Sequence, residues 1–457
     1  MMRTSTLWIV AVFSVFFLLA GCGDEDADAE QNHDLGDNNA QQEDANQDDD
    51  DDPDGNNGGA NNSEDADDDD EEDDESVDDD DGDDENSDDP PEEEEEGPWA
   101  DLPPEPWNTQ EAGPFEVAYR YEGFDYTPRA EDETREVGLS IWYPTFEDDG
   151  DHARYADWFH QPGVWQDAEP ALRDPAPVLI FSHGNGGIST QSFFFTEYFA
   201  SHGWIVISPD HTGNTFLDME GGGINLESAV YRPQDLTQAL DYVLQFPDDD
   251  PLSGYFSDKI AVSGHSFGGY TTLAIAGATF PVDELVAGCD SGEIDDAFCQ
   301  IFSDQHMEVF RDGFLDPRIQ AAIPQTPGGA AVMADGLDEI DIPVFMWTAA
   351  GDITLPNHEE GDPLWEGLAG EHDVRIDAEA TGHFTFSNMC DLVGDFVGQV
   401  ADDGCGEEFM EPEVIHPLIN TYSHEYLRYH LLGEEDSGEW FSTDHTPLHE
   451  NLNFSFK

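Results

Sequence analysis

The sequence has 457 residues, of which 107 are Asp or Glu and only 13 are Lys or Arg, giving a formal net charge of −94. This imbalance argues against nucleic acid and anionic lipid headgroups as partners, because binding to phosphate requires clustered Lys and Arg. Much of the charge lies before residue 97, so the whole-chain value does not describe the part that folds.

The first residues indicate export. One cation, Arg3, precedes an apolar stretch, Leu7 to Ala20, that is too short to span a bilayer comfortably and fits the core of a secretory signal. Its end, "LAGC", resembles a bacterial lipobox, which implies cleavage before Cys22 and a diacylglycerol on the Cys22 thiol. Residues 1–21 are therefore expected to be a lipoprotein signal peptide, with a plain secretory signal as the alternative. The protein would then face the periplasm or the cell surface of a bacterial envelope, and this lipid would be its membrane contact.

Residues 22–97 are expected to form a disordered acidic tether. They are almost all Asp, Glu, Asn, Gly and Gln, so they have little apolar surface whose burial could offset the loss of chain entropy on folding. Calcium is the alternative partner of this tract, because carboxylates are hard oxygen ligands. The tract lacks the ligand spacing of an EF-hand loop, so we expect diffuse cation condensation and no defined metal site.

Four further cysteines suggest disulfides. An even number of cysteines in an exported chain favours disulfide bonding over four free, buried thiols, and the sequence has no C-x-x-C pair that would indicate a metal site. Of the three possible pairings, the shortest loops favour Cys289–Cys299 and Cys390–Cys405.

From Pro98 onward the composition is globular, and residues 98–457 are expected to form one domain. Short apolar or alternating runs predict strands at 114–124, 135–145, 176–184, 204–211, 259–264, 318–326, 343–352 and 373–383. Helical spacing predicts helices at 192–203, 232–246 and 267–280, the second with Leu236, Leu240, Val243 and Leu244 on one side. Alternating strands and helices predict a mostly parallel sheet covered on both faces. The stretch 282–313 is expected to be an insertion.

Gly264-His265-Ser266-Phe267-Gly268 fits the pattern G-x-S-x-G. A buried strand precedes the motif and a helix rich in Ala and Gly follows it, as a nucleophilic serine on a tight strand-to-helix turn requires. Ser266 is therefore the candidate nucleophile, with a serine that merely caps a tightly packed helix as the alternative.

An activated serine needs a base and an orienting carboxylate, which in this kind of fold follow the serine in the order acid, then histidine. Asp352 and His383 each follow a predicted strand, where the carboxyl ends of parallel strands deliver ligand-facing residues. Among rival histidines, His265 adjoins Ser266 at a sharp turn and is expected to point elsewhere. His183 is expected to shape its own turn, and His211 precedes the serine in the chain. Asp373 and Asp377, the rival acids, lie at the start of a strand and within it.

The glycine-rich loop "FSHGNGG", Phe181 to Gly187, can turn a backbone N–H toward a substrate carbonyl oxygen. We assign the two oxyanion donors to the N–H groups of Asn185 and Phe267. The alternative is that the N–H of Gly184 or Gly186 replaces that of Asn185. The non-functional interpretation is that the loop is a simple tight turn.

These motifs resemble the α/β-hydrolase superfamily, and within it the branch of platelet-activating-factor acetylhydrolases and dienelactone-hydrolase-like serine esterases. The pieces that carry the resemblance span roughly Gly138 to Phe386 and are "IWYP", "FSHGNGG" with "FASHGWIVISPDH", "GHSFGG", "AAGD" and "GHFTF". The resemblance implies an α/β-hydrolase fold with the insertion after the nucleophile helix. Two positions depart from it. Where the acetylhydrolases carry their acid this chain has Gln325, and where dienelactone hydrolases have a cysteine nucleophile it has Ser266.

The sequence therefore predicts a serine hydrolase of carboxylic esters, acting on a small-molecule or lipid ester through an acyl-enzyme on Ser266 without a cofactor. Residues 98–457 would be its catalytic domain. The alternatives are a peptidase, lipase or polyesterase of the same fold, or a surface-display protein that has lost activity.

Overall fold

The computed structural model describes residues 97–218, 225–292, 304–393 and 401–457, together with Ile294, Cys299 and Ile301. The expected signal peptide, the expected lipidation site Cys22 and nearly all of the acidic tether lie outside these residues. Within the described ranges, every helix is too short or too polar to cross a membrane.

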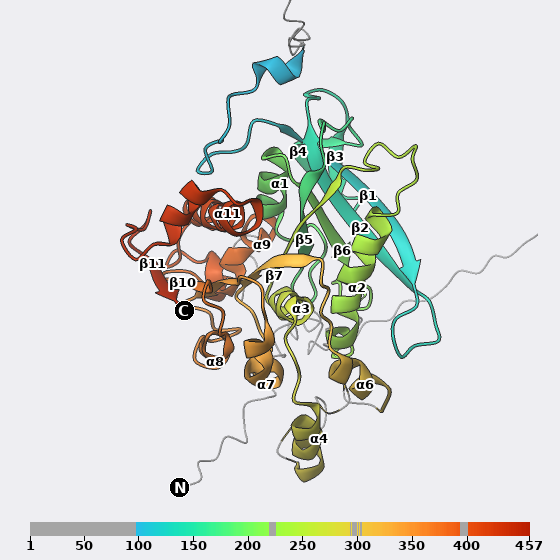
Figure 1. Ribbon diagram of the computed structural model, residues 1–457, viewed down its shortest axis with the longest axis vertical. Coiled ribbons are helices and arrows are strands. Elements are labelled where there is room, and N and C mark those ends of the chain that lie inside the picture. Colours follow the sequence, from blue (N-terminus) through green and yellow to red (C-terminus); the bar gives the residue numbers. More distant parts are fainter. Residues whose placement is uncertain are drawn as a thin grey trace, which may run out of the picture. The chain divides into compact units, whose positions relative to one another are not determined.

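A mixed, 11-stranded sheet forms the centre of the described chain (Figure 1). The strand order is β11-β10-β9-β8-β7-β5-β6-β2-β1-β4-β3. Neighbouring strands from β10 to β6 are parallel, whereas β11 and β2 pair antiparallel with the two ends of this parallel block. The strands are β1 (Glu116–Tyr126), β2 (Arg135–Thr145), β3 (His152–Tyr155), β4 (Phe159–Gln166), β5 (Ala176–Ser182), β6 (Ile205–Asp210), β7 (Phe256–His265), β8 (Ile319–Gln325), β9 (Phe345–Ala349), β10 (Val374–Ala378) and β11 (Leu452–Phe456).

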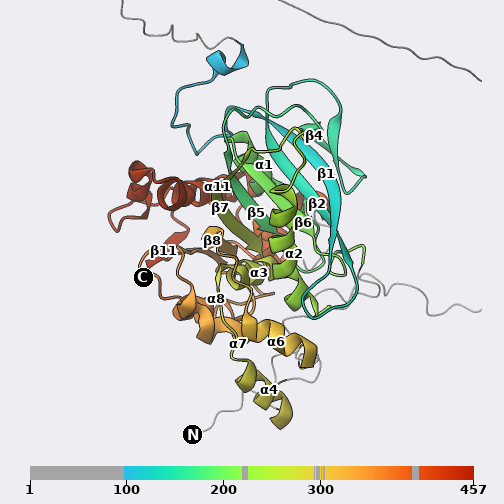
Figure 2. The ribbon, with the colours of Figure 1, turned by 45° about the vertical axis from the view of Figure 1, so that its right-hand side comes forward.

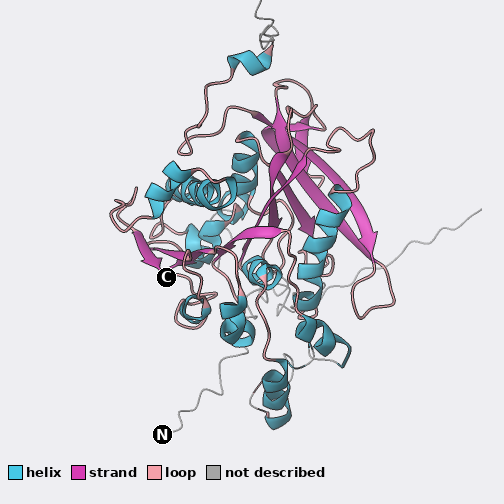
Figure 3. Ribbon diagram, viewed as in Figure 1, coloured by secondary structure: helices cyan, strands magenta, loops and turns pink. Residues whose placement is uncertain are grey.

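Helices cover both faces of the sheet, as its buried central strands require (Figures 2 and 3). Along β5, Ile180 belongs to the core cluster that includes α2 (Ser228–Val243) and α3 (Phe267–Ala276). Its neighbour Leu179 belongs to the other cluster, with α1 (Phe193–Ser201) and α11 (Pro412–Leu427). Successive residues of one strand thus supply two separate cores, which explains the unbroken apolar runs in the sequence.

The expected insertion lies between α3 and β8. It contains α4 (Val282–Ser291) and α6 (Asp304–Asp312), and the Cys289–Cys299 disulfide closes its first part. Further along the chain come α7 (Ala330–Met333), α8 (Gly361–Gly367) and α9 (Met389–Val393). The predicted mostly parallel, doubly covered sheet with an insertion after the nucleophile helix is therefore confirmed, and the carboxyl ends of β5, β7, β8, β9 and β10 share one edge, where a site is expected.

Candidate active site

Ser266 lies at a sharp turn between β7 and α3. Its backbone has φ 60° and ψ −118°, a strained conformation for a residue with a side chain. The turn is held because the Ser266 N–H donates to the carbonyl oxygen of Gln325 at 2.9 Å, while the Ser266 carbonyl accepts the N–H of Gly269 at 2.9 Å. The Ser266 side chain remains partly exposed at the carboxyl edge of the sheet.

The two glycines of the motif are required by close packing. A Cβ on Gly264 would lie 2.4 Å from the carbonyl oxygen of Gly268, and a Cβ on Gly268 would lie 1.8 Å from the carbonyl oxygen of Ser182. Both distances are far shorter than van der Waals contact, so a side chain at either position would push the turn away from β5. This explains why the serine stands between glycines where a strand gives way to a helix.

Asp352 and His383 form a direct hydrogen bond. They follow the adjacent parallel strands β9 and β10, and His383 Nδ1 lies 2.7 Å from Asp352 Oδ2 with both side chains buried. Burial alone would lower the pKa of His383, but the charge of Asp352 and this hydrogen bond, with the charge of Asp403 added, outweigh burial and raise it above its ordinary value of 6.5. A proton held on Nδ1 by the carboxylate leaves Nε2 as the nitrogen that can accept another.

His265 brings the histidine loop beside the serine. Its Nε2 lies 2.9 Å from the carbonyl oxygen of His383, and the two rings are 4.7 Å apart between centroids. Because His265 directly precedes Ser266, this contact joins the backbone of the His383 loop to the serine turn. Their side chains are not hydrogen-bonded to each other, and within the described residues neither Ser266 Oγ nor His383 Nε2 has another hydrogen-bond partner.

The loop after β5 leaves one backbone donor available. The N–H of Gly184 donates to Gln191 Oε1 at 3.0 Å, and the N–H of Gly186 donates to the carbonyl oxygen of Asn214 at 3.1 Å. The N–H of Asn185 has no acceptor among the described residues. The N–H groups of Gly184 and Gly186 are therefore occupied by internal hydrogen bonds, whereas the N–H of Asn185 is not.

This loop lies against the serine turn. A Cβ on Gly184 would be 3.4 Å from Ser266 Cβ, so the loop and the turn are in contact. Phe267, the other expected donor, is the first residue of α3. The amino-terminal end of a helix carries the positive end of the helix dipole, which suits an oxyanion.

A buried arginine on α2 holds the loop after β5 through hydrogen bonds. The Arg232 guanidinium donates to Asn214 Oδ1 at 2.6 Å, to Ser182 Oγ at 3.1 Å and to the carbonyl oxygen of His183. Asn214 Nδ2 in turn donates to Asn185 Oδ1 at 2.7 Å. Sequence reasoning missed this role of Arg232. Its signal was a cation on the apolar side of a helix, in a chain with very few cations.

A second group of a serine, a histidine and an aspartate is joined by hydrogen bonds in the buried part of this region. His211 Nε2 is 2.9 Å from Ser182 Oγ, and His211 Nδ1 is 2.8 Å from Asp235 Oδ2. All three side chains are fully buried, and burial together with the charge of Arg232 lowers the pKa of His211 to about 3. His183 is also buried, with Nδ1 2.7 Å from the carbonyl oxygen of Gly184. This set is closed to a substrate and acts as structure.

The rival acids contact other groups. Asp377 accepts a hydrogen bond from Thr348 Oγ1 at 2.8 Å, and Asp373 accepts the backbone N–H of Val344 at 3.1 Å. Gln325, which replaces the acid of the acetylhydrolases, is fully buried and bonds to the side chain of Ser263. Among the candidate acids, Asp352 is therefore the one that is hydrogen-bonded to the side chain of His383.

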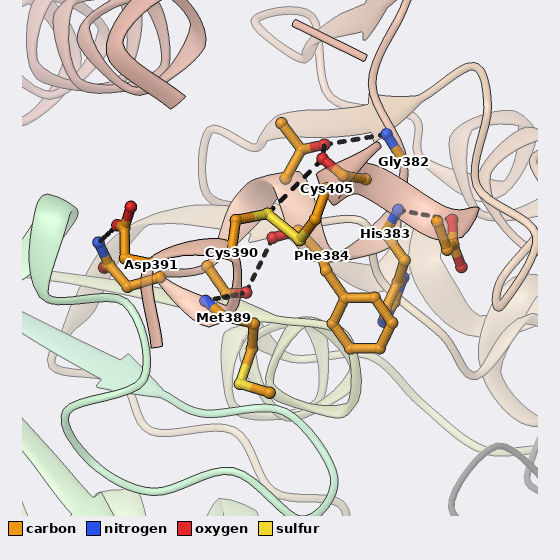
Figure 4. Close-up of a disulfide and its surroundings, with 12 residues drawn as sticks. Gly382, His383, Phe384, Met389, Cys390, Asp391 and Cys405 are labelled. Carbon is orange, nitrogen blue, oxygen red and sulfur yellow. Dashed lines mark hydrogen bonds between the residues drawn. A yellow bond between two sulfur atoms is a disulfide. The ribbon is translucent and has the colours of Figure 1, made fainter. Parts of the chain in front are cut away.

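Both expected disulfide pairings are confirmed. Cys289 is bonded to Cys299, and Cys390 is bonded to Cys405. The second bridge lies close to His383, as Figure 4 shows.

Comparisons with known proteins agree with this geometry. A family model described as Chlorophyllase matches residues 168–284. The platelet-activating factor acetylhydrolase of Bos taurus is 26% identical over 152 residues, which cover 24% of this chain and 34% of that protein. Cutinase 2 of Thermobifida cellulosilytica is 33% identical over 99 residues, which cover 22% of this chain and 34% of that protein. The matched segments thus span about a third of these curated relatives.

A solved structure, that of a ferulic acid esterase from Streptomyces cinnamoneus, has a TM-score of 0.53 and 20% identity, covering 74% of this chain and 96% of that chain. At this identity the likeness bears on the fold alone. Together with the sheet topology and the serine turn, these similarities identify the described part of the chain as an α/β-hydrolase fold, similar in sequence to esterases of that fold.

Proposed function

We propose that the protein is a serine hydrolase that cleaves carboxylic esters through an acyl-enzyme on Ser266. The observation that carries the proposal is the 2.7 Å hydrogen bond between His383 and Asp352, beside a strained and partly exposed serine. The sequence similarity to an acetylhydrolase and to cutinases supports ester hydrolysis over other chemistry of this fold.

In the proposed reaction, Ser266 Oγ attacks the ester carbonyl carbon while His383 Nε2 takes the hydroxyl proton. The carbonyl oxygen becomes an oxyanion, which accepts hydrogen bonds from the N–H groups of Asn185 and Phe267. The intermediate then collapses, and the alkoxide leaves with the proton from His383. Water, deprotonated by the same histidine, attacks the acyl-enzyme and releases the carboxylic acid. Asp352 holds the histidine tautomer and stabilises the imidazolium at each transfer.

Replacing Ser266 tests this proposal directly. The Ser266→Ala variant should fold, because alanine removes one oxygen that has no partner among the described residues. It should lose about 10³-fold or more of kcat on p-nitrophenyl acetate, since the nucleophile itself is absent. A fluorophosphonate probe should label the parent protein, with the modified residue mapped to Ser266. A variant that hydrolyses the ester at the parental rate would refute the assignment.

The same measurements separate the alternatives. A display protein that has lost activity would not react with the fluorophosphonate. A panel of p-nitrophenyl esters of increasing acyl length, an insoluble polyester film and a peptide anilide would distinguish a short-chain esterase from a lipase, a polyesterase or a peptidase.

A further inference from the structure

We propose that Asp403 is a positioning residue of this site, whose buried carboxylate ties the loop that carries His383 to the loop that carries Asp352. The inference rests on the proposed function, because it assigns Asp403 the task of holding the base and its acid in register. Asp403 lies in the turn Ala401–Cys405, distant in sequence from Asp352.

The carboxylate of Asp403 is saturated by donors from both loops. Oδ1 accepts the backbone N–H of His383 at 2.9 Å and the backbone N–H of Ile353 at 3.1 Å. Oδ2 accepts the backbone N–H of Thr354 at 2.9 Å and the Thr354 hydroxyl at 2.6 Å. Asp403 is fully buried, so these four donors take the place of water around its charge.

This bridge acts where the two loops leave the sheet. The β9–β10 ladder joins Ala349 to Ala378 but does not extend to Asp352 or His383. Past the last ladder pair, two backbone hydrogen bonds of 2.9 Å among the described residues still join the two chain segments, from the Ala350 N–H to the carbonyl oxygen of Ala378 and from the Gly351 N–H to that of Thr381. The Asp403 carboxylate adds its bonds at the histidine itself and directly after the acid, which fixes the relative position of the two side chains.

The segment of Asp403 is itself held firmly. A Cβ on Gly382 would lie 2.4 Å from the carbonyl carbon of Asp403, so the two backbones are in direct contact. The Thr385 hydroxyl donates to the carbonyl oxygen of Gly404 at 3.2 Å. The disulfide from Cys405 to Cys390 then fastens this turn to the chain that follows His383, close to Phe384 (Figure 4). The Asp403 carboxylate therefore belongs to a turn that is fixed by a disulfide, a hydrogen bond and close backbone packing.

Three titratable groups face His383. Asp352 bonds to its ring, Asp403 bonds to its backbone and His265 packs against it. Burial lowers the pKa of His265 well below its ordinary range, so His265 is neutral at physiological pH. The two negative charges therefore both favour the imidazolium form of His383.

The test is the Asp403→Asn variant in the full chain. Asparagine keeps the size and one acceptor oxygen, but its NH₂ group would face the donors of Thr354. We expect kcat to fall about tenfold or more, because small displacements of a catalytic group can cost up to about 100-fold. KM for p-nitrophenyl acetate should change by less than about twofold, since the substrate is not touched. The acid limb of kcat/KM should move to lower pH, because a negative charge beside the imidazolium is lost.

Asp373→Asn is the matched control. Asp373 is also buried and accepts the backbone N–H groups of Val344 and Gly370, but it lies at the amino-terminal ends of β9 and β10, opposite to the site. It should lose thermal stability while retaining the parental kcat and acid limb.

The outcomes are distinguishable. Parent protein that neither hydrolyses esters nor reacts with the fluorophosphonate would overturn the proposed function. An active parent with an Asp403→Asn variant of parental kcat, or of lower kcat with an unmoved acid limb, would overturn the role of Asp403 alone. If Asp403→Asn does not fold, Thr354→Val removes one donor only. A lower kcat at unchanged KM then supports the role, and an unchanged kcat overturns it.

Discussion

At the scale of single residues, burial separates two Ser–His–Asp sets with similar hydrogen-bond lengths. His383 and His211 each lie within 3 Å of a carboxylate oxygen, at 2.7 Å and 2.8 Å. The difference lies in the serine, because Ser182 is fully buried and receives a hydrogen bond from Arg232, whereas Ser266 is partly exposed on a strained backbone. The histidine–carboxylate distance alone would therefore not distinguish the proposed catalytic set from the buried one.

The raised pKa of His383 predicts the pH dependence of the reaction. The base must be neutral to accept the Ser266 proton, so activity is present above the pKa of His383 and is lost below it. Because the carboxylates raise this pKa, the acid limb of kcat/KM should have its midpoint above 6.5, the ordinary value for histidine. Profiles measured with two esters of different leaving group should share this limb, since it belongs to the free enzyme. A midpoint clearly below 6.5 would contradict the arrangement.

At the scale of elements, α2 serves the loop after β5 as well as the core. The apolar side of α2 packs on the sheet, and Arg232 on the same helix reaches the loop through Asn214. Burial lowers the pKa of Arg232 to about 9, and the charge of Asp235, on the same helix, opposes this effect only in part. The position of Asn185, the proposed oxyanion donor, is therefore expected to depend on the packing of α2.

The Asn214→Ala variant tests this coupling. It removes the link between Arg232 and Asn185, so the Asn185 N–H should lose its fixed direction. Loss of one oxyanion donor costs about 10²–10³ in kcat, so a loosened donor should cost less, about tenfold. Asn420→Ala is the control, because Asn420 is buried and donates instead to the carbonyl oxygen of Phe194 in α1. Parental kcat in Asn214→Ala would show that other contacts hold the loop.

Local patterns predicted eight of the eleven strands and the helices α1, α2 and α3, but missed the neighbouring strands β3 and β4 and the end of the chain. The predicted apolar side of α2 is correct at Leu236, Leu240 and Val243, but Leu244 is 44% exposed because the helix ends at Val243. No element was predicted after residue 383, although α11 covers one face of the sheet and β11 completes its edge. Their buried apolar residues belong to the core cluster that includes β9 and β10, so these elements are stabilised by packing on those strands.

The candidate site divides in the same way. Ser266, Asp352, His383 and Asn185 could be predicted because each lies in a short motif or directly after a strand. Asp403 could not, since nothing local marks an aspartate in so acidic a chain, and its bonds join it to residues around positions 353 and 383. In the proposed site, the residues that would act on the substrate can be recognised from a local sequence pattern. The residue that would position them can be recognised only from its contacts in the folded structure.

At the scale of the whole molecule, repulsion among carboxylates dominates the electrostatics. Residues 98–457 alone contain 67 of the 107 acids and 12 of the 13 cations, so few of their carboxylates can have a partner, and one of these cations, Arg232, is fully buried. Arginines that pair with carboxylates among the described residues include Arg120, Arg135, Arg311, Arg318, Arg375 and Arg428. The exposed pair Arg311–Asp283 is weak and sensitive to salt, whereas a more buried pair such as Arg135–Asp235 is screened less. Weakening these pairs with salt therefore costs little.

Salt should therefore stabilise the protein. Raising NaCl from about 0.1 M to about 1 M shortens the screening length from about 10 Å to about 3 Å, which relieves repulsion between unpaired carboxylates more than it weakens close pairs. We expect the melting temperature and the kcat/KM on a neutral ester to rise together over this range. Sodium sulfate at the same low ionic strength is the control. Screening depends on ionic strength, so at low salt both salts should act alike, whereas the exclusion of sulfate from the protein surface adds stability only at higher concentration. A melting temperature that stays flat or falls would mean that the acidic surface is not under electrostatic strain.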